Sequence, residues 1–423
     1  MTTPAPAITW QDELALTGRT PPLFFPDLAS VEAAGTAAAQ AHYLRRAFEA
    51  LELDGILCQG NAPIAYFREV PQLTSELVSE LHRRFWNLGV SPLLVLIDAT
   101  EVHVYSGLAT PRPDGATAAA DERLVARLDR VAQALEVNQL TLAIESGEIF
   151  HREQRAFDRN RRVDRQLLQN LKATRDAMAA IGPARMDPRS LDNFLCRVVF
   201  TSYLFDRGVI DQRYLRDAGL AGAVTLCDLA KQKQLYRLFE RLSDDFNGDL
   251  FSDDLAAEAS GIREAHWRIL ESFLSGTNIV TGQGSFWPYD FSVIPIETIS
   301  AIYEHFLKAA DPDAKKEKGA FYTPRFLAEI TLDMALDGVK DLLGKRFLDP
   351  ACGSGVFLVG LFNRLAREWS LRNPEADYTH RADGLIGILK KNLVGADVSP
   401  TACRIAAFSL YLALLDQLKP PQI

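Results

Sequence analysis

The 423-residue chain has few cysteines, no long apolar run and no excess of positive charge. Its five cysteines are an odd number, and no two have C-x-x-C spacing, so neither a disulfide framework nor a zinc knuckle is predicted. No stretch approaches the roughly 20 apolar residues of a membrane span, and the first residues lack a signal-peptide pattern. We therefore expect a cytoplasmic protein whose cysteines are buried thiols and which has no metal site.

The net charge of −9 disfavours a chain that clamps duplex DNA by itself, because phosphate contacts need lysine and arginine. One local exception is a basic stretch from His151 to Arg165, which can touch DNA phosphates. Acidic residues are interleaved with it at Glu153, Asp158 and Asp164. From the sequence alone we favour a solvated helix face for this stretch.

The length predicts two or three domains, and the periodicity changes twice along the chain. Helix and strand signals alternate first, which predicts an N-terminal α/β domain over residues 1–120. Mostly helical periodicity follows and predicts a helical connector over residues 121–310. Strand–helix alternation then predicts a third domain, residues 311–423, with a doubly wound sheet. The expected fold class is α/β plus helical.

The most informative block lies in the third domain, between an apolar strand signal and a helical pattern. It reads Asp349, Pro350, Ala351, Cys352, Gly353, Ser354 and Gly355. A glycine turn between strand and helix lets backbone N–H groups and the helix N-terminus face a small polar ligand. The block is not the G-x-G-x-x-G fingerprint, and it lacks the Lys-Ser/Thr of a phosphate loop, which disfavours ATP. The alternative is a turn that binds nothing.

Two further blocks flank the glycine turn in sequence. Asp397, followed by Val398, comes at the end of the next strand signal, where an acid can accept hydrogen bonds from both ribose hydroxyls. Its alternative role is a helix N-cap. Upstream, a helix over 325–336 is predicted, with Thr323 as N-cap and Pro324 at the first position. We expect Thr323 and Pro324 to form a pocket edge together with the aromatic residues Phe321 and Tyr322.

Taken in their order along the chain, the upstream block, the glycine turn and the Asp397 block resemble motifs X, I and II of DNA adenine-N6 methyltransferases of the gamma arrangement, in large type IIG-like restriction–modification or phage-defence enzymes. The resemblance implies a Rossmann-like domain that binds S-adenosylmethionine. Asp349 to Gly355 would line the methionine and ribose side of this cofactor. Asp397 would bind the ribose hydroxyls, with Val398 beside the adenine. Phe321 to Pro324 would close the methionine end.

The family's catalytic tetrad, Asn/Asp-Pro-Pro-Tyr/Phe, does not occur in this sequence. In the family, its Asn side chain and proline carbonyl bind the target amino group, and its aromatic ring stacks on the flipped adenine. We therefore name no catalytic residue and expect an N-terminal, catalytically incomplete portion of a longer enzyme. Double-stranded DNA, bound mostly through other parts, is the expected partner, with a specificity subunit or other defence-system proteins.

Type IIG enzymes often begin with a nuclease in which an Asp and a Glu/Asp-x-Lys pair hold Mg²⁺. Asp54 can supply the first acid, but Ala65 and Phe67 stand where the second acid and the lysine are expected. Glu69 has no lysine two residues later. The sequence thus predicts a degenerate nuclease-like scaffold or a plain accessory domain.

The leading hypothesis is the cofactor-binding and N-terminal portion of a site-specific DNA adenine-N6 methyltransferase in a restriction–modification or phage-defence system. Methyl transfer from a sulfonium needs mainly in-line positioning of the amine. One alternative is a bifunctional enzyme with an active N-terminal endonuclease. Another, from a different class, is a non-catalytic module for S-adenosylmethionine binding or assembly.

Overall fold

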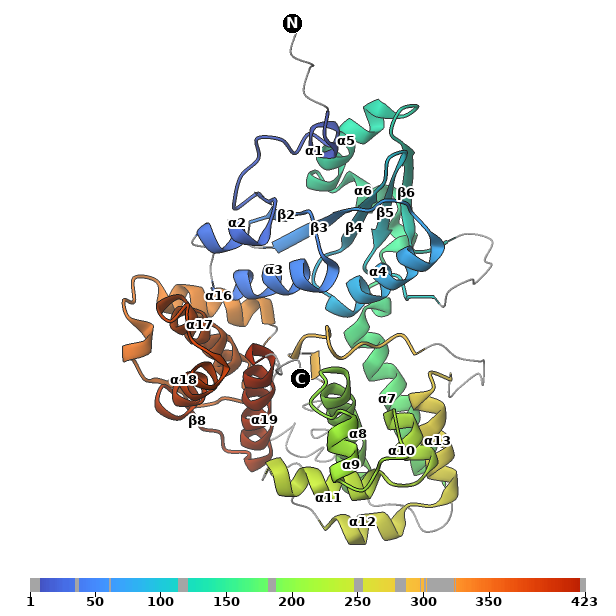
Figure 1. The fold of residues 1–423 in the computed structure, drawn as a ribbon, viewed down its shortest axis with the longest axis vertical. Helices are drawn as coiled ribbons and strands as arrows, with labels where there is room; N and C mark the ends of the chain where they lie inside the picture. Colours follow the sequence, from blue (N-terminus) through green and yellow to red (C-terminus); the bar gives the residue numbers. More distant parts are fainter. Residues whose placement is uncertain are drawn as a thin grey trace, which may run out of the picture. The chain divides into compact units, whose positions relative to one another are not determined.

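A computed structural model of the protein describes residues 8–34, 38–60, 62–112, 121–181, 188–246, 254–277, 287–296, 298–299, 302, 323 and 325–418. The chain divides into two compact units (Figure 1). Unit 1 is residues 1–166 with 288–293, and unit 2 is residues 167–287 with 294–423. The mixed α/β fold class is confirmed, while the three domain ranges stay a prediction.

Unit 1 contains a mixed six-stranded sheet. Its strands are β1 (Phe24–Phe25), β2 (Gly55–Gln59), β3 (Ala62–Glu69), β4 (Leu93–Ile97), β5 (Glu101–Ser106) and β6 (Leu124–Asp129). They lie side by side in sequence order. Neighbouring strands are antiparallel except for β3 and β4, which are parallel and pair Ala65 with Leu93. A parallel pair needs a crossover, and α4 (Ser75–Leu88) supplies it.

Helices cover both faces of this sheet (Figure 1). They are α1 (Trp10–Glu13), α2 (Leu28–Ala33), α3 (Ala38–Leu51), α4 (Ser75–Leu88), α5 (Ala134–Glu145) and α6 (Glu148–Arg152), with short 3₁₀ turns η1 (Gln154–Ala156) and η2 (Arg159–Arg161). Local sequence signals define both ends of α4. The Thr74 side chain accepts from Leu77 N–H at the start, and Gly89 ends the helix with φ of 62°.

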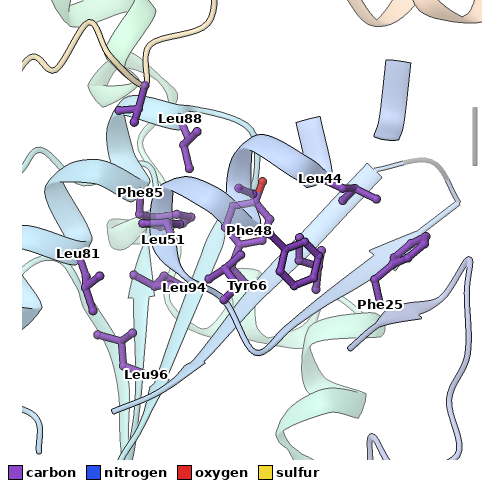
Figure 2. Packing of buried hydrophobic residues seen from close by; sticks show 14 of the residues in the cluster. Phe25, Leu44, Phe48, Leu51, Tyr66, Leu81, Phe85, Leu88, Leu94 and Leu96 are labelled. Carbon is purple, nitrogen blue, oxygen red and sulfur yellow. The ribbon is translucent and has the colours of Figure 1, made fainter. Parts of the chain in front are cut away.

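The core of unit 1 follows the alternation of side chains along β4. Leu94 and Leu96 pack with α3 and α4 in one cluster (Figure 2). Leu93, Val95 and Ile97 pack in a second cluster against α1 and α5. Both faces of β4 are therefore buried, as its uninterrupted apolar sequence predicts.

Unit 2 begins with a helical part. Its helices are α7 (Val163–Ala179), which starts at the end of unit 1, α8 (Pro188–Asp206), α9 (Gln212–Asp217), α10 (Leu226–Lys231), α11 (Leu235–Phe246), α12 (Leu255–Gly261) and α13 (Glu264–Leu274). A buried ion pair links two of them: Arg197 Nη1 donates to Glu258 Oε1 at 2.6 Å. Tyr236 Oη donates to the same oxygen at 2.8 Å, so the buried carboxylate is well satisfied.

The second part of unit 2 alternates helices and strands. Its elements are α16 (Arg325–Leu336), the 3₁₀ turn η4 (Leu342–Gly344), β7 (Phe347–Asp349), α17 (Val356–Arg372), α18 (Tyr378–Lys391), β8 (Leu393–Gly395) and α19 (Pro400–Gln417). Strands β7 and β8 are parallel, with Asp349 opposite Gly395. Their carboxyl ends therefore lie together, and each end leads into a helix.

Two segments of unit 1 differ from the sequence prediction. For residues 8–30 no helix was predicted, but α1 packs against the sheet and Trp10 stacks on Phe67 with ring centroids 5.8 Å apart. Strand β6 lies where helical periodicity was expected from residue 121. Its register against β5 pairs Arg127 with His103, and Val125 is the only buried residue of the strand, in line with its weak apolar alternation.

Candidate functional site

The glycine turn connects β7 to α17 in the predicted strand–turn–helix arrangement. Backbone hydrogen bonds shape it: Cys352 N–H donates to Ala396 O at 2.9 Å, and Gly355 N–H donates to Cys352 O at 2.8 Å. Ala396 N–H donates to Asp349 O at 2.9 Å. The turn is thus tied directly to the loop that follows β8.

Both glycines of the turn have positive φ, but their surroundings differ. Gly353 has φ of +52°, and a Cβ built there meets no atom within 4 Å. Gly355 has φ of +87°, and its Cβ would lie 3.0 Å from Ala406 Cα of α19. Gly355 is therefore needed for packing, whereas Gly353 leaves open space beside the backbone.

Among the described residues, only one carboxylate oxygen of Asp349, at the end of β7, has a hydrogen-bond partner. Its Oδ1 accepts Ala351 N–H at 3.1 Å. Its Oδ2 is buried and has no hydrogen-bond partner among the described residues. A buried unsatisfied carboxylate oxygen is costly, and it calls for a cation or a donor.

The N-terminus of α17 offers the opposite charge preference. This helix is 17 residues long, starts at Val356 after the N-cap Gly355, and receives no side-chain cap hydrogen bond. The first N–H groups of a helix have no partner within the helix and favour an anion. An acceptor for a cation and donors for an anion thus flank the same turn.

Asp397 joins the loop after β8 to the glycine turn. Its Oδ2 accepts Gly353 N–H at 3.0 Å, and its Oδ1 accepts Ser399 N–H at 2.8 Å. The N-cap of α19 is Ser399, whose hydroxyl accepts from Ala402 N–H, so the alternative reading of Asp397 as that cap is wrong. Each carboxylate oxygen keeps a free acceptor direction. The neighbouring Val398 side chain is 82% exposed.

Two thiols, whose proximity was not predicted, lie behind this junction. Burial, followed by the neighbouring Cys403, raises the pKa of the Cys352 thiol to about 12. Cys403 Sγ lies 3.8 Å from Asp397 O. A thiol that stays protonated is a weak nucleophile, so Cys352 has a packing role, with Leu358 and Ala406 in its cluster.

Most of the upstream block lies outside the described residues. This holds for Phe321, Tyr322 and Pro324, whereas Thr323 is described and is half-buried. The predicted helix over 325–336 is confirmed as α16.

A buried arginine that sequence reasoning missed ties α16 to α17. Arg364 Nη2 lies 2.9 Å from Glu329 Oε2 and 2.5 Å from Asp333 Oδ1. Its Nη1 donates to Gly360 O at 3.1 Å. The i, i+4 spacing of the two acids is the sequence signal that could have pointed to a shared cation. The helix that follows the upstream block is therefore held to the helix that follows the glycine turn.

The nuclease positions in unit 1 are occupied by structural residues. Ala65 and Phe67, where an acid and a lysine are expected, are both fully buried in the apolar cluster with Trp10. Asp54 Oδ2 accepts Glu69 N–H at 2.7 Å and so holds the C-terminal end of β3. Within the described part of the chain, no group of three His, Cys, Asp or Glu could hold a metal ion.

The described helices include none that is long and apolar enough to cross a membrane.

Chemically, the junction of β7 and β8 offers acceptors for an ammonium and for hydroxyls, and backbone donors for a carboxylate. This donor and acceptor set fits an amino-acid–nucleoside conjugate, and the described residues of the junction include no side chain placed as a nucleophile.

Comparison with known proteins agrees with this chemistry. Residues 295–418 match the family model described as N-6 DNA Methylase. Over 116 residues the chain is 32% identical to the type I restriction enzyme MjaIX methylase subunit of Methanocaldococcus jannaschii, covering 27% of this chain and 17% of that protein. Over 108 residues it is 32% identical to the adenine-specific methyltransferase PglX of Streptomyces coelicolor, covering 24% of this chain and 8% of that protein.

A third relative, the type II methyltransferase M.MamI of Microbacterium ammoniaphilum, is 29% identical over 155 residues, covering 36% of this chain and 37% of that protein. A cryo-electron-microscopy structure of a DrdV–DNA complex covers 97% of this chain and 38% of that chain, with 14% identity and a TM-score of 0.35. A structural similarity this low supports no conclusion about fold or function. The chain spans well under half of each relative's length.

The predicted resemblance to DNA adenine-N6 methyltransferases of restriction–modification systems is confirmed by the family match and by the relatives. Enzymes of this family take the methyl group from S-adenosylmethionine, which confirms the predicted cofactor at the level of the family.

Proposed function

We propose that this chain holds S-adenosylmethionine for methyl transfer to the N6 amino group of adenine in DNA. One observation carries the proposal: Asp397, after β8, accepts the Gly353 N–H of the turn after β7 at 3.0 Å. Ligands of open α/β sheets bind outside the carboxyl ends of such strands. The proposed cofactor would therefore bind at the junction of these two loops.

The methionine end of the cofactor fits the two sides of the glycine turn. We assign the α-ammonium to Asp349, whose buried Oδ2 has no partner among the described residues. The α-carboxylate would meet the free N–H groups at the start of α17. The open space at Gly353 lets backbone atoms of the turn approach the ligand. The remaining lining residues of the turn are Pro350, Ala351, Cys352, Ser354 and Gly355.

The nucleoside end fits the loop after β8. Asp397 keeps one acceptor direction on each carboxylate oxygen, which suits the two ribose hydroxyls. Val398 presents an exposed apolar side chain that can cover the adenine ring without leaving a polar group unpaired. The block from Phe321 to Pro324 is proposed to close the methionine end.

The reaction itself is proposed for the whole protein. The amino group of adenine attacks the methyl carbon, the bond from that carbon to the sulfonium breaks, and the amine later loses one proton. Positioning supplies most of the acceleration of such a step. The tetrad that holds the adenine does not occur in this sequence, so we assign this chain the holding of the methyl donor.

Calorimetric titration tests the cofactor site with two ligands. S-adenosylmethionine carries the ammonium and carboxylate, whereas methylthioadenosine shares the ribose and adenine but lacks both charged groups. Asp349→Asn should weaken S-adenosylmethionine binding about 10- to 100-fold, as expected for a charged hydrogen bond, and leave methylthioadenosine binding unchanged. Asp377→Asn is the matched control, because it makes the same charge change at an N-cap where Asn serves equally well.

A folded wild-type chain that binds neither ligand would refute the proposal. Equal weakening of both ligands by Asp349→Asn would refute the ammonium assignment alone. Methylation itself is tested with the full-length protein, by transfer of a labelled methyl group to adenine in duplex DNA.

For unit 1 we propose a nuclease-like scaffold without a working metal site. The supporting observation is the packing of Phe67 against Trp10, which puts an apolar ring at the expected lysine position. Incubation of full-length protein with plasmid DNA and Mg²⁺ should give no cleavage. Cleavage that is lost in Asp54→Ala would favour the bifunctional alternative instead.

The partners are also proposals. Duplex DNA is the expected substrate, and one relative is named as a methylase subunit of a type I restriction enzyme. Assembly with a specificity subunit or other defence-system proteins is therefore proposed for the whole protein.

A further inference from the structure

The segment from η1 to the first turn of α7 carries three arginines that the other described residues of unit 1 do not neutralise. They are Arg155 in η1, Arg159 in η2 and Arg165 in the first turn of α7, and all three are exposed. Among the described residues none of them has an ion pair or a side-chain hydrogen bond. We call these three residues the arginine turn.

Most acids near the arginine turn are already engaged by other arginines. Glu148 pairs with Arg152 at 2.6 Å, and Asp164 pairs with Arg162 at 3.1 Å.

Arg161 engages two more acids, since it lies 2.6 Å from Glu122 and 3.8 Å from Asp158. Of the acidic residues between positions 148 and 164, only the exposed Glu153 has no ion pair among the described residues. The unpaired charge of the turn is therefore positive, although the chain as a whole carries −9.

The backbone beneath these side chains is fixed to the body of unit 1. Trp86 Nε1 donates to Arg161 O at 2.8 Å, and Ser106 Oγ donates to Ala156 O at 2.6 Å. The rings of Phe150 and Phe157 pack edge to face at 4.9 Å and join the apolar cluster under the sheet. The arginines thus project from a preorganised turn, which lowers the entropy lost when a ligand orders them.

We propose that the arginine turn is a contact surface for the phosphate backbone of duplex DNA. Guanidinium groups suit phosphate because they donate in a planar fork, and each neutralised phosphate releases counterions. This inference deepens the proposed function, which it rests on for the choice of DNA as the polyanion. It assigns a backbone-positioning role to unit 1 and no sequence recognition.

Fluorescence anisotropy with a labelled duplex tests this surface in the full 423-residue chain. Affinity is measured between about 50 and 200 mM salt, where log K falls linearly with log salt. Relative to wild type, the triple variant Arg155→Ser/Arg159→Ser/Arg165→Ser should lower affinity and make the slope less negative by about 2 to 3, or about 0.9 per lost phosphate contact.

A matched control separates local contact from net charge. Arg45→Ser/Arg84→Ser/Arg127→Ser makes the same formal charge change in unit 1, at arginines that pair with Glu32, Glu80 and Glu101. We expect its salt slope to equal that of wild type, and both variants to keep wild-type circular dichroism and S-adenosylmethionine binding.

Equal loss in both triple variants would overturn the proposal, as would a wild-type chain that does not bind DNA at low salt. Tighter binding of an RNA duplex of the same length would overturn the choice of DNA. A chain that fails to bind S-adenosylmethionine but shows the predicted change in slope would refute the proposed cofactor role and leave this surface supported.

Discussion

Asp397 Oδ2 accepts the backbone N–H of Gly353 at 3.0 Å, across 44 residues of sequence. This contact connects the two loops at the carboxyl ends of β7 and β8. The same carboxylate also accepts Ser399 N–H through Oδ1. One side chain therefore shapes both loops and still has acceptor capacity for two hydroxyl groups.

Replacement of Asp397 should weaken both nucleoside ligands. Asp397→Ala removes the proposed acceptors for the ribose and leaves Gly353 N–H without its partner. Loss of a charged hydrogen bond costs about 1.5 to 3 kcal/mol, so we expect S-adenosylmethionine and methylthioadenosine to bind at least about 10-fold more weakly in the calorimeter. Unchanged binding of methylthioadenosine would contradict the ribose assignment.

The two glycines of the turn should respond differently to alanine. In Gly355→Ala the new Cβ lies 3.0 Å from Ala406 Cα, and φ is +87°, so both clash and strain destabilise the fold. In Gly353→Ala the Cβ meets nothing within 4 Å, and only the strain of a left-handed residue remains, about 1 kcal/mol. Thermal unfolding should show a larger loss for Gly355→Ala.

Gly353→Ala should reduce the affinity for the cofactor far more than it reduces the stability of the fold. The added methyl group enters the space where the turn is proposed to meet the cofactor, so binding should fall sharply while the fold remains stable. Wild-type affinity in a folded Gly353→Ala variant would show that no ligand approaches this side of the turn.

Arg364 should be important for the stability of unit 2. Its side chain is 4% exposed and contacts both Glu329 and Asp333. Arg364→Met leaves two carboxylates without their cation, which in fully buried pairs costs about 3 to 5 kcal/mol. Because the two acids are partly exposed, we expect about 2 kcal/mol, measured by urea unfolding.

A double-mutant cycle separates the ion pair from packing. If charge dominates, Arg364→Met combined with Asp333→Asn should be less destabilised than the sum of the two single changes. Strict additivity would mean that Arg364 acts through its packing alone.

The sequence predicts the parts of this fold in which local and tertiary preferences agree. Strand β4 is apolar throughout and is buried on both faces, and α4 has a threonine cap and a terminal glycine. The glycine turn is predictable for the same reason, since Gly353 and Gly355 have positive φ that few other residues adopt.

The sequence does not predict the contacts that depend on distant partners. Arg364 looks like one more polar residue of a helix until α16 supplies its two acids. Strand β6 is defined by pairing with β5 rather than by its own alternation. The Cys352–Cys403 proximity likewise needs α19 to be in place behind the turn.

His82 predicts how the stability of unit 1 depends on pH. Its Nε2 donates to Ser106 O at 2.9 Å, while Nδ1 has no partner in the described part of the chain. Burial lowers the pKa of His82 from its ordinary value of 6.5 to about 4. The unfolded state therefore takes up a proton near pH 6.5, whereas the folded state does so only near pH 4.

The stabilisation by neutral His82 is complete above pH 6.5 and is lost as the pH falls toward 4, by up to about 3 kcal/mol. His82→Gln is the control, because its amide can still donate to Ser106 O but does not titrate. Urea midpoints for residues 93–106, followed by hydrogen-exchange pulses at one fixed labelling pH, should fall more steeply with acid in wild type. His266, in unit 2, has a pKa lowered by burial as well, so only peptides of unit 1 decide the comparison. Parallel pH dependence of wild type and His82→Gln in those peptides would show that His82 is not the titrating group.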